Sequence, residues 1–109
     1  MAARKPAPAP VCIGDMTENT PFGPITVPIA PTIQRYLTRK GQEMWRVRCP
    51  RCGRIHEHEV GSVREGGRGA HCGAEVQERG DYWMTDGSHL PLIPNVREAD
   101  AELRGLGWL

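Results

Sequence analysis

The stretch that decides the fold of this chain is Cys49-Pro50-Arg51-Cys52-Gly53, followed by His56 and His58 and then by His71-Cys72-Gly73. Three of the four cysteines and three of the four histidines fall within residues 49–73. Thiolates and imidazoles gathered in this way are the donors that a tetrahedral zinc site uses. The sequence therefore predicts a small domain organised around one Zn²⁺ ion.

The residues around this stretch predict a hairpin with the metal at its tip. In a C-P-x-C-G turn both thiolates face one ion, backbone amides point at the sulfurs, and Gly53 supplies the positive φ that reverses the chain. Residues 43–48 alternate large apolar with charged side chains, which is typical of a half-buried strand. Residues 54–60 return as the second strand, with His56 and His58 on the same face.

The sequence predicts four metal ligands, three thiolates and one imidazole: Cys49, Cys52, Cys72 and His56. Thiolates dominate structural zinc shells, which favours the three cysteines. His71 is adjacent to Cys72, and neighbouring residues seldom both reach one ion. His58 lies roughly 20 Å of extended contour from Cys52, so the closer His56 is the preferred histidine. If the strand bends, His58 takes its place.

Composition explains why such a domain needs a metal. The chain has 109 residues, of which 39% are hydrophobic, with one Phe, two Tyr and three Trp, so little apolar area is available for a core. Zinc binding contributes on the order of 10 kcal/mol to the folding of small domains. We therefore expect a small, mainly-β, zinc-ribbon-like domain over residues 33–93, between an extended proline-rich arm (residues 1–32) and a C-terminal helix with a hydrophobic tail (residues 94–109).

Proline dominates the N-terminal third of the chain. Alternating Ala and Pro in MAARKPAPAP, residues 1–10, predict an extended segment that packs no core. Further prolines in residues 11–32 exclude a helix and leave room only for short edge strands near Ile25 and Ile29. Cys12 has no second ligand nearby in sequence, so we expect it to be a small buried hydrophobe rather than a ligand.

Three segments that flank the metal stretch are less distinctive. Residues 32–38 fit both one face of a helix and a strand, because their apolar members, Ile33, Tyr36 and Leu37, suit either period. Residues 39–42 predict a turn. Residues 74–84 predict a second hairpin in which Tyr82 and Trp83 cover the ribbon.

The clearest helix is at the C-terminus. Asn95 is a predicted N-cap with Glu98 three residues later, and Gly105 stands where a helix-terminating glycine belongs, which predicts a helix over residues 96–104. Two explanations of its apolar stripe stay open: packing on the chain's own ribbon, or docking on a protein partner. The stripe consists of Val96, Ala99, Leu103, Leu106 and Trp108.

Several function classes are disfavoured. A redox C-x-x-C centre needs a βαβ frame that this proline-rich chain is too short to build. No H-E-x-x-H pattern for a catalytic zinc is found, so we expect no enzyme activity. The first residues carry no apolar signal-peptide core and no run reaches membrane-spanning length, so we expect a cytosolic protein with reduced thiols and no membrane partner.

Charge is distributed unevenly although the net charge is only +1. Residues 35–68 carry nine Lys or Arg and four acids, whereas residues 75–109 carry three Arg and seven acids. A basic segment around a zinc site favours nucleic-acid binding as one hypothesis. Its candidate contacts are Trp45, Arg46, Arg48, Arg51 and Arg54.

The runs CPRCGRIHEH and GRGAHCG together resemble the C-P-x-C-G-x-x-H-x-H … R-x-x-H-C pattern of small uncharacterised zinc-ribbon-like proteins of actinobacteria and their phages. The resemblance covers residues 49–73 and implies a metal site without an established activity. We therefore expect an assembly or interaction protein, such as a phage structural or accessory component, located in the bacterial cytoplasm or the virion. Nucleic-acid binding in transcription or DNA transactions is the alternative.

Overall fold

The computed structural model describes residues 13–61, 65–69 and 81–108, which form a mainly-β structure with one C-terminal helix, as the sequence predicts. Within these residues no helix combines the length and the apolar character needed to span a membrane. The elements, in chain order, are β1 (Asp15–Thr20), β2 (Gly23–Ala30), β3 (Thr32–Leu37), β4 (Glu43–Arg48), β5 (Ile55–Glu59), β6 (Gly66–Gly69), β7 (Asp81–Met84), β8 (Leu92–Ile93) and α1 (Val96–Gly105).

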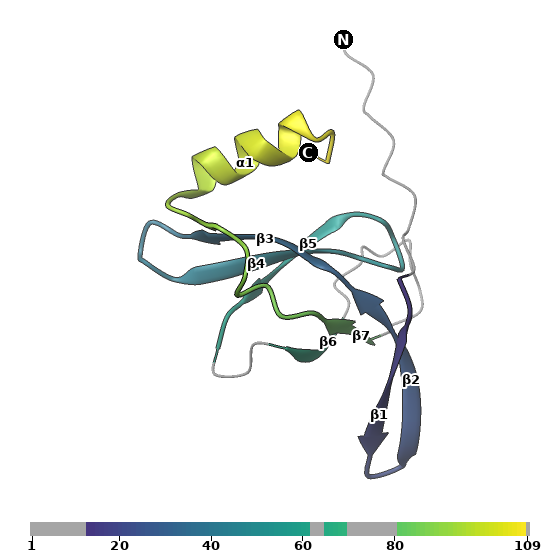
Figure 1. The fold of residues 1–109 in the computed structure, drawn as a ribbon. Helices are drawn as coiled ribbons and strands as arrows, with labels where there is room; N and C mark the ends of the chain where they lie inside the picture. The colour runs from purple at the N-terminus through teal and green to yellow at the C-terminus, as the bar shows by residue number, and fades with distance from the viewer. Residues whose placement is uncertain (1–12, 62–64, 70–80, 109) are drawn as a thin grey trace.

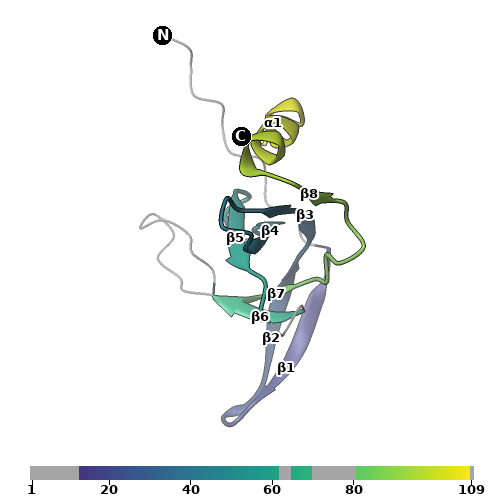
Figure 2. The same ribbon diagram turned by 90° about the vertical axis from the view of Figure 1, so that its left-hand side faces the viewer.

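The described elements stack in three layers, with α1 above one sheet and a second sheet below it (Figures 1 and 2). The upper sheet has the strand order β5-β4-β3-β8, and the lower sheet has the order β1-β2-β7-β6. Strands β3, β4 and β5 are antiparallel neighbours, whereas β8 adds to β3 in parallel. In the lower sheet β7 pairs antiparallel with β6 and parallel with β2. The upper sheet is therefore covered on both faces.

Strand β4 supplies side chains to both interfaces of the upper sheet. Trp45 and Val47 are fully buried and belong to the core cluster with Ala30, Tyr82 and Met84 of the lower sheet. Arg46, which lies between Trp45 and Val47, must point to the opposite face of the sheet, because side chains alternate along a strand. That face is closed by α1, so β4 is buried on both sides rather than half-buried as predicted.

The opposite face of β4 holds a buried arginine, Arg46, that joins the helix to the sheet. Its guanidinium donates from Nε to Glu57 Oε1 (2.7 Å), from Nη1 to Gln34 Oε1 (3.2 Å) and from Nη2 to Asp100 Oδ1 (2.6 Å). It also lies over the ring of Tyr36, 4.6 Å from the ring centroid. The contacting residues belong to β3, β5 and α1, so the side chain of Arg46 links β4 to all three elements.

The second half of the predicted arm is a β-hairpin and belongs to the folded domain. Strands β1 and β2 pair antiparallel from Asp15 with Pro28 to Thr20 with Gly23. Prolines are tolerated in β2 because β1 pairs with it from Gly23 to Pro28 and β7 pairs with it only at Ile29 and Ala30, so Pro24 and Pro28 lie where β2 has a strand partner on one side. The expectation of an extended arm over residues 1–32 therefore does not describe residues 15–30, and residues 1–12 lie outside the described part of the chain.

The segment that fits both a helix and a strand in sequence is the strand β3. Its residues pair with β4 on one side and with β8 on the other, so tertiary pairing selects the extended form. The turn predicted for residues 39–42 is confirmed. Gly41 has a φ of 83°, and its amide donates to the carbonyl of Thr38 (2.9 Å).

The helix α1 begins as predicted and ends one residue later. The side chain of Asn95 accepts from the amide of Glu98 (2.9 Å), which confirms the N-cap. Gly105 is the last helical residue, and Gly107, with a φ of 79°, is the glycine that reverses the chain. The prediction that Gly105 terminates the helix was wrong because both glycines fit the composition of a helix end.

The apolar stripe of α1 is divided between the chain's own sheet and solvent. Ala99 and Leu103 are buried, and the carbonyl of Ala99 accepts from Gln34 Nε2 of β3 (3.0 Å). Val96 and Leu106 are exposed by 42% and 59%. Packing on the chain's own sheet therefore accounts for Ala99 and Leu103, which are not available as partner contacts.

Replacing Leu103 by Ala should destabilise the protein by about 2–5 kcal/mol, because the side chain is buried and leaves a cavity between α1 and β3. The matched control is Leu106→Ala at the C-cap of the same helix, an exposed position where the change should alter the free energy of unfolding by less than about 0.5 kcal/mol. Urea unfolding of both variants measures the difference. Equal losses for the two leucines would contradict this placement of the helix.

The phenol of Tyr36 makes the stability of the folded protein depend on pH in the alkaline range. Burial, the hydrogen bond that its hydroxyl donates to Glu57 Oε1 (2.7 Å) and the charge of that carboxylate raise its pKa from 10.0 to about 12. The folded state thus holds this proton more tightly than the unfolded state. The resulting stability is complete below pH 10.0 and is lost as the pH rises through about 12.

We therefore expect the free energy of unfolding of the wild type to fall more steeply than that of Tyr36→Phe when the pH is raised from about 9 to about 11. Urea unfolding at the two pH values measures both slopes. Parallel slopes would show that Tyr36 titrates in the folded state as it does in the unfolded chain.

Candidate metal centre

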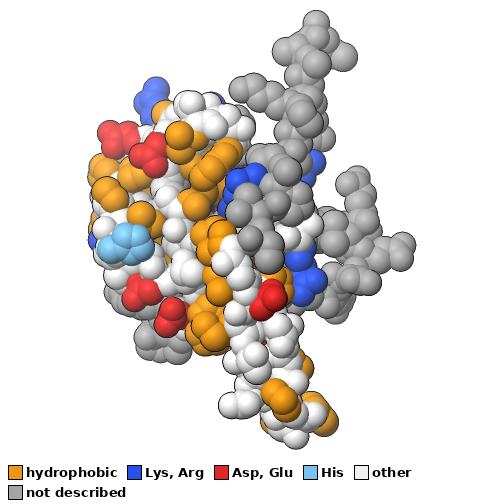
Figure 3. Space-filling view, turned by 45° about the vertical axis from the view of Figure 1, so that its right-hand side comes forward, with side chains coloured by type: hydrophobic (Ala, Val, Ile, Leu, Met, Phe, Trp, Pro, Cys, Tyr) orange, Lys and Arg blue, Asp and Glu red, His pale blue; other side chains and the backbone are white. Residues whose placement is uncertain are grey.

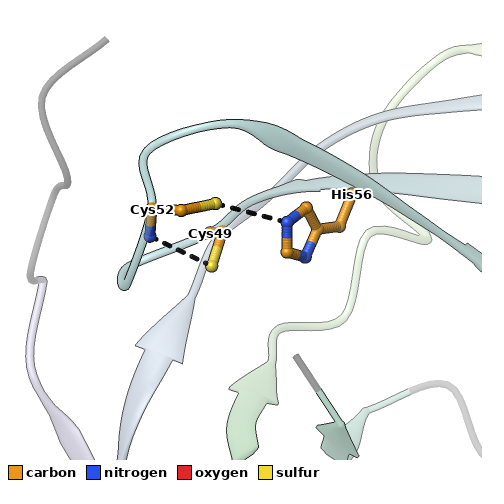
Figure 4. A group of neighbouring side chains, drawn as sticks. All are labelled: Cys49, Cys52 and His56. Atoms are coloured by element: carbon orange, nitrogen blue, oxygen red, sulfur yellow. Dashed lines mark hydrogen bonds between the residues drawn. The ribbon is translucent and has the colours of Figure 1, made fainter. Parts of the chain in front are cut away.

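Three of the four predicted metal ligands converge at the turn between β4 and β5. Cys49 directly follows β4, Cys52 lies within the turn, and His56 is the second residue of β5. Their ligand atoms all lie within 4.8 Å of one another, close enough to hold one metal ion. Figure 4 shows the three side chains pointing toward a common centre. Neither cysteine is joined in a disulfide.

The backbone of the turn is fixed by two hydrogen bonds and one glycine. The amide of Cys49 donates to the carbonyl of Arg54 (2.9 Å), and the amide of Gly53 donates to the carbonyl of Cys49 (2.9 Å). Gly53 has a φ of 76°, a conformation that side chains with a Cβ rarely adopt. The predicted role of this glycine is therefore confirmed.

Two backbone amides of the same turn point at one sulfur. The amides of Arg51 and Cys52 lie 3.4 Å and 3.5 Å from Cys49 Sγ and donate to it. Two amides that donate to the same sulfur hold Cys49 Sγ in a fixed place within the turn. The C-P-x-C-G pattern predicts that backbone amides of the turn point at a cysteine sulfur, and this is confirmed for Cys49.

The structure distinguishes the two histidines of β5. His56 Nε2 lies 3.4 Å from Cys52 Sγ, whereas His58 Nε2 contacts the hydroxyl of Tyr82. Among the described residues, the group that could hold a metal contains His56 and does not contain His58. The strand does not bend enough to bring His58 to the two sulfurs. His56, the histidine preferred from the sequence, is the one that lies beside them.

The cluster lies at the junction of the two sheets and is largely shielded from water. Cys49 is fully buried within the core cluster and His56 is 9% exposed, while Cys52 packs against the same cluster from a half-buried position. Cys49 is therefore at once a core residue and a candidate ligand. In such an environment the attraction between a thiolate and a cation is stronger than in water.

One predicted ligand, Cys72, and two residues that were not predicted as ligands, His71 and Cys12, lie outside the described residues. The third thiolate, Cys72, falls in residues 70–80, together with His71. Cys12 falls in residues 1–12. Their predicted roles stay predictions.

The candidate nucleic-acid contacts do not form a common surface. Trp45 is 0% exposed and Arg46 is 6% exposed, so neither can stack on a base or reach a phosphate. The guanidinium of Arg48 lies over the ring of Trp108, 5.6 Å from its centroid. Arg54 is exposed and Arg51 half-buried. The prediction was wrong for Trp45 and Arg46 because the sequence does not show that both faces of β4 are covered.

Tyr82 was not predicted to be part of the site. The sequence predicted a core role for this residue, and Tyr82 is indeed fully buried. Its hydroxyl, however, contacts both His56 and His58 from the other sheet. A buried tyrosine needs a partner for its hydroxyl, and nearby histidines are natural partners, but only the fold shows that they meet.

Comparisons with protein-family models, with curated proteins and with solved structures found no match for this chain. Its function is therefore inferred from the chemistry of the site itself.

Replacing Cys49 by Ser, or His56 by Ala, should weaken metal binding by more than about 100-fold, because each change removes a ligand rather than a residue that supports one. Titration with Co²⁺, followed by its absorption, measures the affinity of each variant. Cys12→Ser is the matched control and should bind like the wild type. Unchanged Co²⁺ binding in the Cys49 variant would rule out this cluster as the metal site.

Proposed function

We propose that this protein is a non-catalytic, zinc-stabilised module that assembles with another protein. The observation that carries the proposal is a hairpin, β1–β2, that projects from the rest of the described structure (Figure 1), whose core includes the candidate ligand Cys49. Its tip residue, Phe22, is 99% exposed. A large aromatic side chain held fully in water on a projecting element favours a binding role over a folding role.

The donor chemistry favours zinc as the metal. Two thiolates and one imidazole are soft to borderline donors, which Zn²⁺ accepts in tetrahedral sites, whereas Mg²⁺ and Ca²⁺ require oxygen ligands. In our proposal Cys72 supplies the fourth ligand. A shell of three thiolates and one imidazole leaves no position for a reactive water, so the ion acts on stability and not on a substrate.

The projecting hairpin has the features of an anchor for a partner. The hydroxyl of Thr20 donates to the carbonyl of Gly23 (2.6 Å) and accepts from the amide of Phe22 (3.2 Å), so the tip is ordered. Hydrophobic side chains gather at this tip, at the bottom of the molecule in Figure 3. A tip whose backbone is already ordered loses less conformational entropy on binding, which favours it as a contact.

The setting we propose follows from the resemblance of residues 49–73 to zinc-ribbon-like proteins of actinobacteria and their phages. A structural or accessory component of a virion needs a small, stable body and a segment that reaches a neighbouring subunit. Both requirements fit a metal-stabilised core with a projecting hairpin. In this proposal the protein acts in the bacterial cytoplasm during assembly or in the particle itself.

Site-specific photo-crosslinking tests the proposed interaction. A benzoyl derivative of phenylalanine replaces Phe22, and the same derivative replaces Leu92 as the control, because Leu92 is also exposed (40%) but lies on β8 in the other sheet. We expect a discrete protein adduct from position 22 and none from position 92. Added wild-type protein should suppress the adduct, and added Phe22→Ser should not. Identical adducts from both positions would contradict the proposal.

A binding assay distinguishes the nucleic-acid alternative. The purified, metal-loaded chain is titrated with single-stranded and double-stranded DNA and RNA at low salt. We expect no measurable affinity, because Trp45 and Arg46 are buried. Tight binding that weakens steeply with added salt would replace the assembly role by a nucleic-acid role.

A further inference from the structure

A buried tyrosine, Tyr82, lies between the two histidines of β5. It comes from β7 of the lower sheet and is fully buried. Its hydroxyl lies 3.4 Å from His56 Nδ1 and also contacts His58 Nε2. The rings of His58 and Tyr82 meet edge to face, with their planes at 82° and their centroids 5.6 Å apart. One hydroxyl therefore connects a candidate metal ligand to a second imidazole.

The protonation of His56 follows from its role as a ligand. Its Nε2 faces Cys52 Sγ at 3.4 Å, so Nε2 is the nitrogen that would hold the metal and must carry no proton. The proton of the neutral ring is then on Nδ1, which faces the Tyr82 oxygen. With a metal on Nε2, His56 would therefore donate from Nδ1, and the hydroxyl of Tyr82 would accept.

We propose that Tyr82 and His58 are positioning residues of the metal centre, and that they act as a hydrogen-bonded chain from His56 Nδ1 through the Tyr82 hydroxyl to His58 Nε2. In this chain the Tyr82 proton points to His58 Nε2, so His58 is the tautomer protonated at Nδ1. This inference rests on the proposed zinc site. It deepens that proposal, because it assigns the residues that orient the histidine ligand.

The chain is held in place by elements other than the metal turn. His56 and His58 stand opposite Val47 and Trp45 in the β4–β5 pair, which fixes their shared direction. Tyr82 is placed by the pairing of β7 with β6 on one side and with β2 on the other. A partner that is fixed independently of the ligand is what orientation of the ligand requires.

The arrangement also gives the second histidine a function. His58 is buried at 8% exposure and stands on the same face as His56, yet it lies outside the cluster that could hold the ion. As the end of the chain it supplies the acceptor that directs the Tyr82 proton away from His56. The C-x-x-C-x-x-x-H-x-H pattern then encodes one ligand and one support for that ligand.

The test compares the affinity for Zn²⁺ of two variants that each lose one tyrosine hydroxyl, with a chromophoric chelator as competitor. Tyr82→Phe keeps the ring and removes the proposed acceptor. Tyr36→Phe is the matched control, since Tyr36 is also buried and its hydroxyl donates to Glu57 on the face that α1 covers. We expect Tyr82→Phe to bind Zn²⁺ roughly 10- to 100-fold more weakly than the wild type, and Tyr36→Phe to bind with unchanged affinity.

A spectroscopic readout separates positioning from mere packing. Nitrogen-15 NMR of the histidine rings in the Zn²⁺-loaded protein should show His58 protonated at Nδ1 in the wild type and in Tyr36→Phe. In Tyr82→Phe that preference should be lost, because no hydroxyl proton is directed at Nε2. A His58 protonated at Nε2 in the wild type would overturn the proposed chain.

Each outcome of the affinity measurement is decisive. If the wild type binds Zn²⁺ and folded Tyr82→Phe binds equally well, the positioning role is wrong and the zinc site stands. If the wild type itself binds no Zn²⁺, the proposed zinc site is wrong and the inference fails with it. If Tyr82→Phe does not fold, His58→Ala decides, because it removes the far end of the chain: weaker Zn²⁺ binding supports the role, and unchanged binding contradicts it.

Discussion

The hydrogen bonds from two backbone amides to Cys49 Sγ are the interaction on which the rest of this structure depends. They exist only if the turn after β4 is closed tightly, and that closure also brings Cys52 and His56 to the same sulfur. Cys49 in turn packs in the cluster that joins the two sheets. This chain has little apolar area, and its candidate metal ligands meet at the same place where the two sheets pack against each other.

The two faces of the upper sheet are stabilised by different chemistry. Below it, aromatic and aliphatic side chains surround the candidate metal ligands. Above it, Arg46 collects contacts from Glu57, Gln34 and Asp100 and attaches α1. Losing one partner of such a buried cation is more costly than losing a surface ion pair, so the helix depends on this network for its position. The segment that is basic in sequence thus serves, in part, to hold the fold together.

Local features of the sequence predicted local features of the structure. The turn at Gly53, the strands on either side and the N-cap at Asn95 depend on residues close together in the chain, and all were predicted correctly. Contacts between residues distant in the chain were not predictable. The alternation of side chains in β4 does not reveal that Arg46 faces a helix, and no residue close to Tyr82 in the sequence indicates that its hydroxyl contacts His58. The short edge strands predicted near Ile25 and Ile29 lie within β2, but the pairing of β2 with β1 was not predicted, because the prolines of this segment favoured an extended arm.

The central proposal is that a zinc ion held by Cys49, Cys52 and His56, with Cys72 as the fourth ligand, stabilises this small domain. Elemental analysis of the purified protein, combined with unfolding measurements before and after removal of metal by a chelator, tests it most directly. The account predicts about one zinc per chain and a large loss of stability when the zinc is removed. A protein that contains no metal, has four free thiols and keeps its fold would contradict it.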